Sequence, residues 1–198
     1  MLAHIRPAVV MMVLFTLLTG LVYPFVMTGI AGVAFPAQAG GSLVHDAKGQ
    51  VIGSSLLAQG FAKPEYLHPR PSAAGNGYDP TSSGGSNLGP MDPKLSTRMT
   101  TDAATYRKDN PTATEIPADA LTTSGSGLDP DVSPANAQMQ AARIAAHRAP
   151  ATVAEVQAII DANTEQPALG FLGDPRVNVL AVNLALDAKY PVAQPRGK

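Results

Sequence analysis

The sequence has no cysteine and no tryptophan, and aromatic residues occupy only 5% of its 198 positions. Without cysteine the chain can form neither a disulfide nor a thiolate metal site, although this leaves its compartment open. The formal net charge of −1 provides no basic face of the kind that binds nucleic acid. Glycine and proline are instead abundant, at 18 residues each. We therefore expect much of the fold to be ordered loop.

Formal charge is also missing from residues 7–45, which contain the most apolar part of the chain. The stretch from Pro7 to Phe35 is long enough to cross a hydrocarbon core of ~30 Å. Arg6 and the amino terminus precede it, and the next basic residue is Lys48, so the positive-inside rule places the amino terminus in the cytoplasm. We predict a cytoplasmic segment at 1–7, a transmembrane helix at 8–35 and an extracytoplasmic domain at 36–198.

A cleaved signal peptide is the alternative interpretation of the same segment. Ala37-Gln38-Ala39 has the small residues of a cleavage site. The apolar stretch, however, is roughly twice the usual length of a signal peptide's apolar region. Cleavage would make the chain a secreted binding module, and an anchored binding module is a further possibility.

Small residues and a proline recur every four positions along the apolar segment. Such a stripe lets membrane helices approach closely, although spanning helices are rich in glycine and threonine in any case. The carbonyl freed by the proline belongs to a glycine, which reduces crowding at that point. The stripe predicts packing against other membrane helices through Thr16, Gly20, Pro24, Thr28 and Gly32.

The rest of the sequence, residues 36–198, predicts an α/β or α+β domain with a single core. Two short strands are expected at 42–58, around a turn at Asp46-Ala47-Lys48-Gly49, and a further strand is expected at 175–187, joining them in one sheet. Helices are expected in 91–110, 135–148 and 152–163, which begin at good capping residues. The caps are Asp92, Ser133 and Thr152 with Glu155, and the expected inward faces are Leu95, Met99, Ala103 and Tyr106, and Val153, Val156, Ile159 and Ile160.

No catalytic or metal pattern stands out. Gly125 and Gly127 form a G-x-G step, but the third glycine of a dinucleotide site is missing. Ser126, His68 and Asp129 contain the residue types of a hydrolase triad, yet nothing in their spacing positions them. The four histidines are far apart in the sequence, so we expect no metal site.

Two glycine-rich polar loops, 68–90 and 118–134, are more patterned than simple connections. Long loops inside compact domains are usually functional or disordered. The first loop and its approach carry Tyr66, His68, Arg70 and Tyr78, which can anchor on a partner. The competing interpretation is a loop that packs on its own domain.

Three stretches, 68–90, 116–145 and 174–187, resemble hallmark segments of the C subunit of the Kdp potassium-transporting ATPase. The sequence at 23–44 fits the same family. Asp131, where a histidine is usual, and the stretch at 140–145 are minor departures.

The resemblance implies a single-pass subunit of a bacterial inner-membrane complex, with a channel-like potassium-translocating subunit, a P-type ATPase subunit and a small fourth subunit as partners. It implies a non-catalytic accessory chain without a cofactor of its own, in a complex that binds ATP. The family is described as a catalytic chaperone that raises the ATP affinity of the ATPase subunit, for which the nucleotide candidates are Ser124, Gly125, Ser126 and Gly127.

The expected topology conflicts with direct nucleotide binding, because the loop lies outside and ATP is cytoplasmic. We therefore favour docking over the entrance of the channel-like subunit and stabilisation of the assembly. The candidates for partner docking are His68, Arg70, Ser72, Tyr78, Ser86, Asn87, Asp129, Arg176 and Asn178.

Overall fold

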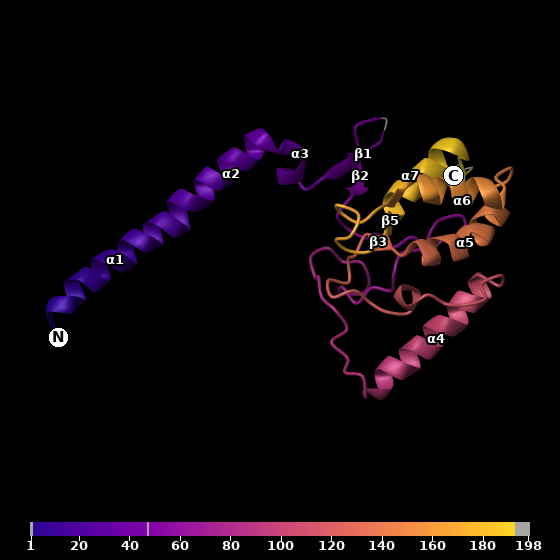
Figure 1. Ribbon diagram of the computed structural model, residues 1–198, viewed down its shortest axis with the longest axis horizontal. Coiled ribbons are helices and arrows are strands. Elements are labelled where there is room, and N and C mark those ends of the chain that lie inside the picture. Colours follow the sequence, from indigo (N-terminus) through magenta and orange to yellow (C-terminus); the bar gives the residue numbers. More distant parts are fainter. Residues whose placement is uncertain (1, 47, 193–198) are drawn as a thin grey trace, which may run out of the picture. The chain divides into compact units, whose positions relative to one another are not determined.

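The computed structural model describes residues 2–46 and 48–192. The chain divides into two compact units, Met1–Ser54 and Ser55–Lys198 (Figure 1). The division falls inside the predicted extracytoplasmic segment, 36–198. Each unit has its own pattern of exposure: the first exposes its apolar side chains, whereas the second buries a core.

The first unit begins with one long helical rod. A short 3-10 turn, η1 (Leu2–His4), leads into α1 (Ile5–Leu17), the π-helical η2 (Leu18–Val22) and α2 (Tyr23–Ala34). Among the described residues, Ile5–Ala34 is the one helix long and apolar enough to cross a membrane, with a mean hydropathy of 2.3 over its most apolar window. None of that window is buried, so its side chains are available to lipid.

The π-helical turn has a cause in the sequence. Pro24 carries no N–H, and its ring crowds the carbonyl four residues back, at Gly20. The wider turn just before it lets the Tyr23 N–H donate to the carbonyl of Leu18, five residues back. The Thr19 hydroxyl also donates to the carbonyl of Phe15, at 2.7 Å. The proline therefore widens one turn of the rod and does not end it.

A short helix and a hairpin complete the first unit. The helix is α3 (Pro36–Ala39), and β1 (Leu43–His45) pairs antiparallel with β2 (Val51–Ser54). The predicted hairpin is confirmed, although its second strand ends at residue 54 and not at 58. In the turn, Asp46 accepts hydrogen bonds from the N–H groups of Lys48 and Gln50, each at 2.8 Å, while Ala47 lies outside the described residues.

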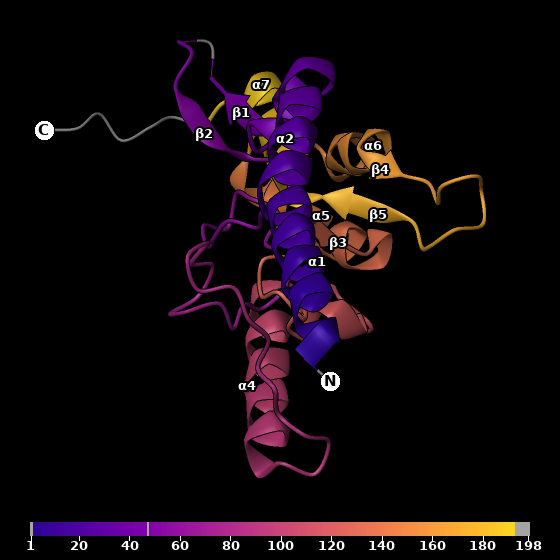
Figure 2. The same ribbon diagram turned by 90° about the vertical axis from the view of Figure 1, so that its left-hand side faces the viewer.

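The second unit combines helices with a small antiparallel sheet, which confirms a mixed helix and sheet fold. Its strands are β3 (Asp131–Val132), β4 (Thr164–Glu165) and β5 (Arg176–Asn178), in the order β3-β5-β4. Its helices are α4 (Pro93–Asp109), η3 (Ala118–Ala120), α5 (Pro134–His147), α6 (Val153–Ala162) and α7 (Val179–Lys189). In Figure 2 the connection from β4 to β5 extends away from these helices.

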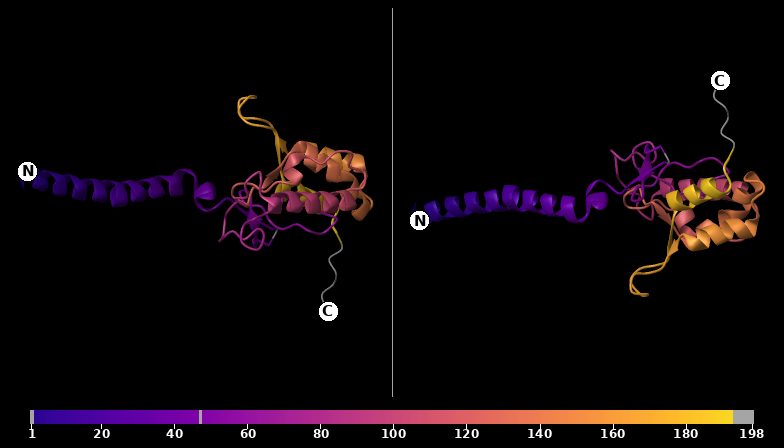
Figure 3. Two further views of the ribbon diagram at one scale, coloured as in Figure 1. Left: turned by 90° about the horizontal axis from the view of Figure 1, so that it is seen from below. Right: turned by 90° about the horizontal axis from the view of Figure 1, so that it is seen from above.

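The core of the second unit lies between α5, α6, α7 and β5. Alanines on α5 keep its inward face small, which allows helices to pack closely. Figure 3 shows these helices grouped in the second unit from below and above. The fully or almost fully buried apolar side chains include Leu67, Val132, Ile144, Val156, Ile160, Val177, Val179, Val182 and Leu186.

The predicted helices are confirmed with their caps. Asp92, Ser133 and Thr152 each accept a hydrogen bond from the first turn of α4, α5 and α6, and Thr152 forms a complete capping box with Glu155. The expected face of α4 is half-buried. Three of the four apolar residues expected to face inward on α6 are buried, whereas Val153, at its first position, is 41% exposed.

The predicted strand at 175–187 is wrong. Only Arg176–Asn178 is extended, and Asn178 then caps α7 by accepting a hydrogen bond from the Ala181 N–H at 3.0 Å. The valines of this stretch suggested a strand, but its buried positions in α7, 179, 180, 182, 183 and 186, follow a helical period. The expectation that this strand joins the N-terminal hairpin is also wrong, because β5 pairs with β3 and β4.

Candidate functional site

A segment that begins in a turn and continues without regular structure, residues 64–70, passes between helices and is held there by amide side chains. The Leu67 N–H donates to Asn183 Oδ1 at 2.8 Å, and Asn183 Nδ2 donates to the Leu67 carbonyl at 3.0 Å. Gln140 holds the next residue in the same way, with contacts of 2.9 and 3.2 Å to the N–H and carbonyl of His68. Two amides thus satisfy this backbone as a neighbouring strand would.

A buried guanidinium fixes the same segment from α5. Arg143 is 6% exposed, and its Nη1 donates to the carbonyls of Pro64 and Tyr66 at 2.6 and 3.0 Å. Its other nitrogens donate to Asn110 Oδ1 and Gln140 Oε1, at 3.1 and 2.6 Å. Burial lowers the pKa of Arg143 to about 10, so the side chain stays charged at neutral pH.

A second buried arginine joins the segment to the end of α7. Arg148 is 3% exposed and donates to the carbonyls of Glu65 and Tyr190. It also pairs with Asp187 at 2.7 Å and lies 4.7 Å from the centre of the Tyr66 ring. Removing Asp187 would be costly, because it would leave the buried guanidinium of Arg148 without its ionic partner.

His68, a docking candidate, has structural partners on both sides. Its Nε2 lies 2.9 Å from the Lys63 carbonyl and 3.3 Å from Arg143 Nη1. The shorter contact favours a proton on Nε2, which donates to the carbonyl. Burial, and then the charge of Arg143, lower the pKa of His68. The side chain is therefore neutral and held in place at neutral pH.

An ion pair joins the two glycine-rich loops. Arg70 Nη1 lies 2.7 Å from Asp129 Oδ2, and both side chains remain partly exposed. The Tyr78 hydroxyl donates to the Arg70 carbonyl at 2.8 Å, and burial raises the pKa of Tyr78 to about 12. Three docking candidates therefore form one connected group.

The Ser72 hydroxyl joins the two loops and also orders its own loop. Its hydroxyl donates to the Gly127 carbonyl at 2.6 Å and accepts from the Ala74 and Tyr78 N–H groups at 3.1 and 2.8 Å. Gly127 has a φ of +67°, and a Cβ there would lie 2.6 Å from the Gly84 carbonyl oxygen and 2.7 Å from the Ala74 nitrogen. Only glycine fits this contact.

The two glycine-rich loops also contact each other at residues 83–86 and 123–126. The Ser126 carbonyl accepts hydrogen bonds from the Gly84 N–H at 2.8 Å and the Ser83 hydroxyl at 3.0 Å. The Thr123 hydroxyl lies 3.4 Å from the Ser86 hydroxyl, and the neighbouring docking candidate, Asn87, adopts a φ of 51°. The interpretation of a loop packed on its own domain therefore describes most of this surface.

The residues considered for nucleotide binding lie within this packed surface. Ser124 Oγ lies 3.3 Å from Ser126 Oγ, which also accepts from the Leu128 N–H. Gly125 is exposed and a Cβ added there would meet nothing within 4 Å, whereas Gly127 is buried. Much of the hydrogen-bonding capacity of this stretch is thus used within the chain.

The last two docking candidates lie on β5. Arg176, in an exposed position, pairs with Asp131 at 3.1 Å and with Glu165 at 2.5 Å. Asn178 donates to the carbonyl of Ser55 and to Asp131 Oδ1, each at 3.1 Å. They brace the sheet and its connection to the start of the unit, and do not bond to the group around Ser72.

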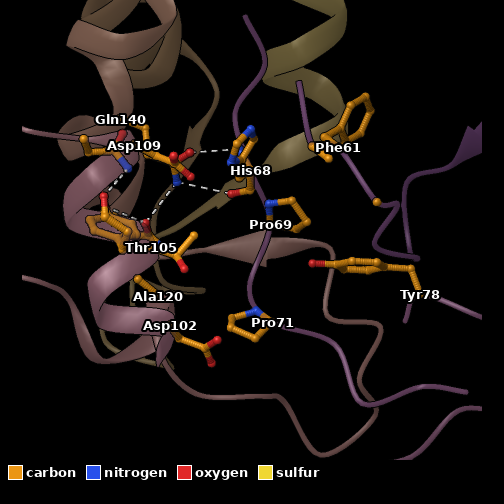
Figure 4. A pocket seen from close by; sticks show the side chains of 15 residues that line it. Phe61, His68, Pro69, Pro71, Tyr78, Asp102, Thr105, Asp109, Ala120 and Gln140 are labelled. Atoms are coloured by element: carbon orange, nitrogen blue, oxygen red, sulfur yellow. Dashed lines mark hydrogen bonds between the residues drawn. The ribbon is translucent and has the colours of Figure 1, made fainter. Parts of the chain in front are cut away.

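A hollow of the second unit, with a volume of about 540 Å³, opens between α4 and the segment that carries His68 and Pro69. In Figure 4, Asp102 lies beside Pro71, and the Tyr78 hydroxyl points toward the segment that carries Pro69 and Pro71. Its wall also contains Tyr106, whose hydroxyl donates to Asn136 Oδ1 at 3.2 Å. The lining thus combines aromatic and proline rings with carboxylates and amides, and most of it is apolar.

Sequence reasoning missed most of the side chains that hold this site together. Asn136, Gln140 and Arg143 stand on one face of an alanine-rich helix, and that polar spacing was the available signal. Neither Asn183 nor Arg148 had a local motif. Within the described residues there is no cluster of three or more histidines and carboxylates.

Comparisons with known proteins agree over nearly the whole chain. Residues 5–188 match the family model described as "K+-transporting ATPase, c chain". The chain is 60% identical over 197 residues to the potassium-transporting ATPase KdpC subunit of Caulobacter sp. (strain K31), with 100% of each chain covered. It is 57% identical over 196 residues to that of Beijerinckia indica, with 98% of each covered, and 50% identical over 190 residues to that of Myxococcus xanthus, with 96% and 88% covered. The chain therefore belongs to the KdpC family.

Proposed function

We propose that the chain is an accessory subunit of a potassium-transporting ATPase, anchored in the bacterial inner membrane by Ile5–Ala34. The amino terminus lies in the cytoplasm and the second unit lies outside. There it stabilises the assembly of the channel-like and P-type ATPase subunits, docking over the entrance of the former. The family match and the exposed apolar helix support this proposal.

The observation that best supports the docking role is that the two glycine-rich loops are bonded to each other. The Arg70–Asp129 ion pair and the Ser72–Gly127 hydrogen bond cross between them. Loops ordered before binding lose little further entropy when a partner arrives. Exposed groups at 81–83, 87 and 125–126 surround these contacts and are free to meet a protein surface.

In this proposal, the chain catalyses no reaction and needs no cofactor of its own, and ATP is bound by the ATPase subunit. The reported chaperone effect, a higher ATP affinity, is then exerted through the assembled complex. Ser126 and Gly127 form hydrogen bonds within the chain, which supports an effect through the complex over direct contact with a nucleotide.

Affinity purification from bacterial membranes tests the proposal. Tagged full-length chain should retain the channel-like, P-type and small subunits, and a variant without residues 7–35 should lose them. Omitting the chain should raise the KM for ATP of the remaining subunits. Retention of the full complex by the truncated variant would contradict the anchoring role, and an intact mass lacking residues 1–39 would favour a secreted binding module.

A further inference from the structure

We propose that the connection between β4 and β5 is a docking element, which inserts an apolar tip into a hydrophobic pocket of another subunit of the transport complex. The apolar tip is defined here as Leu169, Phe171 and Leu172. This inference rests on the proposed function, because it assumes that the chain assembles with other subunits. It assigns the contact to a part of the chain that lies outside the two glycine-rich loops.

The apolar tip is unusually exposed for its composition. Leu169, Phe171 and Leu172 are 82%, 74% and 55% exposed, and they lie within four consecutive positions. Figure 2 shows the connection reaching away from the rest of the second unit. Single exposed apolar residues are ordinary, but a cluster of three on a projecting turn is typical of an interaction surface.

The tip is ordered by its own backbone. The Gly170 N–H donates to the Pro167 carbonyl at 2.9 Å, and the Leu172 N–H donates to the Ala168 carbonyl at 2.9 Å. Leu169 and Gly170 adopt φ values of 56° and 80°, which closes the turn and turns the apolar side chains outward. A turn that is already closed loses less entropy on binding than a flexible loop would.

The base of the connection is fixed as well. Glu165 and Arg176 face each other across the β4–β5 pair and form an ion pair. Arg176 also pairs with Asp131 of β3 at 3.1 Å. Val177, on the same strand, is fully buried in the core. The projecting tip is therefore mounted on the sheet and does not swing freely.

The charges near the apolar tip indicate that it binds a protein pocket and not a lipid surface. The connection itself, residues 166–175, contains one acid, Asp174, and no lysine, arginine or histidine, and at its base Glu165 is paired with Arg176. Segments that bind anionic membranes carry basic residues around their apolar side chains. An apolar tip whose own connection carries one acidic and no basic side chain fits a protein pocket with a neutral or basic rim.

Photo-crosslinking from the tip tests this contact directly. The chain has no cysteine, so Phe171→Cys in full-length protein provides one attachment point for a benzophenone maleimide. In the purified complex, irradiation should give an adduct between this chain and another subunit, identified by mass spectrometry. An intact complex that yields no protein adduct, or only lipid adducts, would overturn the proposal.

A triple variant tests whether the contact stabilises the complex. Leu169→Ser, Phe171→Ser and Leu172→Ser together should reduce the co-purified subunits at least about tenfold, as expected for loss of an interface centre. Met91→Ser is the matched control, because Met91 is 92% exposed elsewhere in the same unit, and it should leave co-purification unchanged. Both variants should keep the wild-type melting profile, since the replaced side chains contribute little to the core.

The outcomes separate the two proposals. If wild-type chain retains the other subunits, and the triple variant retains them equally, the docking element is refuted and the accessory function stands. If wild-type chain retains none of them, the proposed function fails, and the docking proposal fails with it.

Discussion

Replacing Asn183 with leucine should strongly destabilise the second unit, although leucine is similar in size and would be buried in the same place. Asn183 is 1% exposed, and its side chain is the partner of both the N–H and the carbonyl of Leu67. The variant leaves these two buried groups without hydrogen bonds. Each such group costs about 1–3 kcal/mol, so the loss is about 2–6 kcal/mol before compensation.

Part of this loss is offset by the apolar surface that leucine buries, which is worth roughly 1–2 kcal/mol. The net destabilisation should therefore be about 0–5 kcal/mol with a midpoint of about 2.5 kcal/mol, a large share of the 5–15 kcal/mol that is typical of a domain. Urea unfolding of the full chain in detergent, followed by circular dichroism at 222 nm, should show a lower midpoint with an unchanged slope. Hydrogen exchange should show the Leu67 amide losing its protection.

The same chemical change at an exposed position provides the control. Asn76 is exposed, so Asn76→Leu should alter stability by no more than about 0.5 kcal/mol. If Asn183→Leu were as stable as this control, with residues 64–68 still protected from exchange, the role assigned to the amide clamp would be refuted.

Three other perturbations have defined outcomes. Burial lowers the pKa of His68 from 6.5. As pH falls below about 6.5, the unfolded chain therefore binds a proton that the folded chain does not, and the free energy of unfolding should fall. His68→Gln should flatten this dependence of the urea midpoint on pH. Gly127→Ala should cost about 2–4 kcal/mol through its positive φ and backbone clash, whereas Gly125→Ala, with open space around it, should stay within about 1 kcal/mol. Gly20→Leu and Gly32→Leu should lower recovery of the other subunits with the tagged chain, and unchanged recovery would count against helix packing through that stripe.

The elements that could be predicted from the sequence were those specified by neighbouring residues. Proline after Asp92 and Ser133 marked two helix starts, and Thr152 with Glu155 marked a third, because caps act within one turn. The stretch at 175–187 failed for the opposite reason. Its β-branched residues favour a strand locally, whereas packing of α7 against the core decided for a helix.

The candidate site was predicted in composition but not in its connections. Arg70, Ser72, Tyr78 and Asp129 were predicted as docking candidates, and the structure joins them in one group by contacts within the chain. What they bind within the chain depends on residues about 50 positions away, and no local pattern carries that information. The tip at 169–172 was not predicted, because three large apolar residues within four positions are typical of a core and only the structure shows them exposed.

The most direct test of the account is the side of the membrane on which the second unit lies. Met91→Cys would give the chain one cysteine at a highly exposed position, which a membrane-impermeant maleimide can label. In intact spheroplasts the account predicts full labelling without permeabilisation. Labelling only after the membrane is opened would place the unit in the cytoplasm and contradict the proposed assembly.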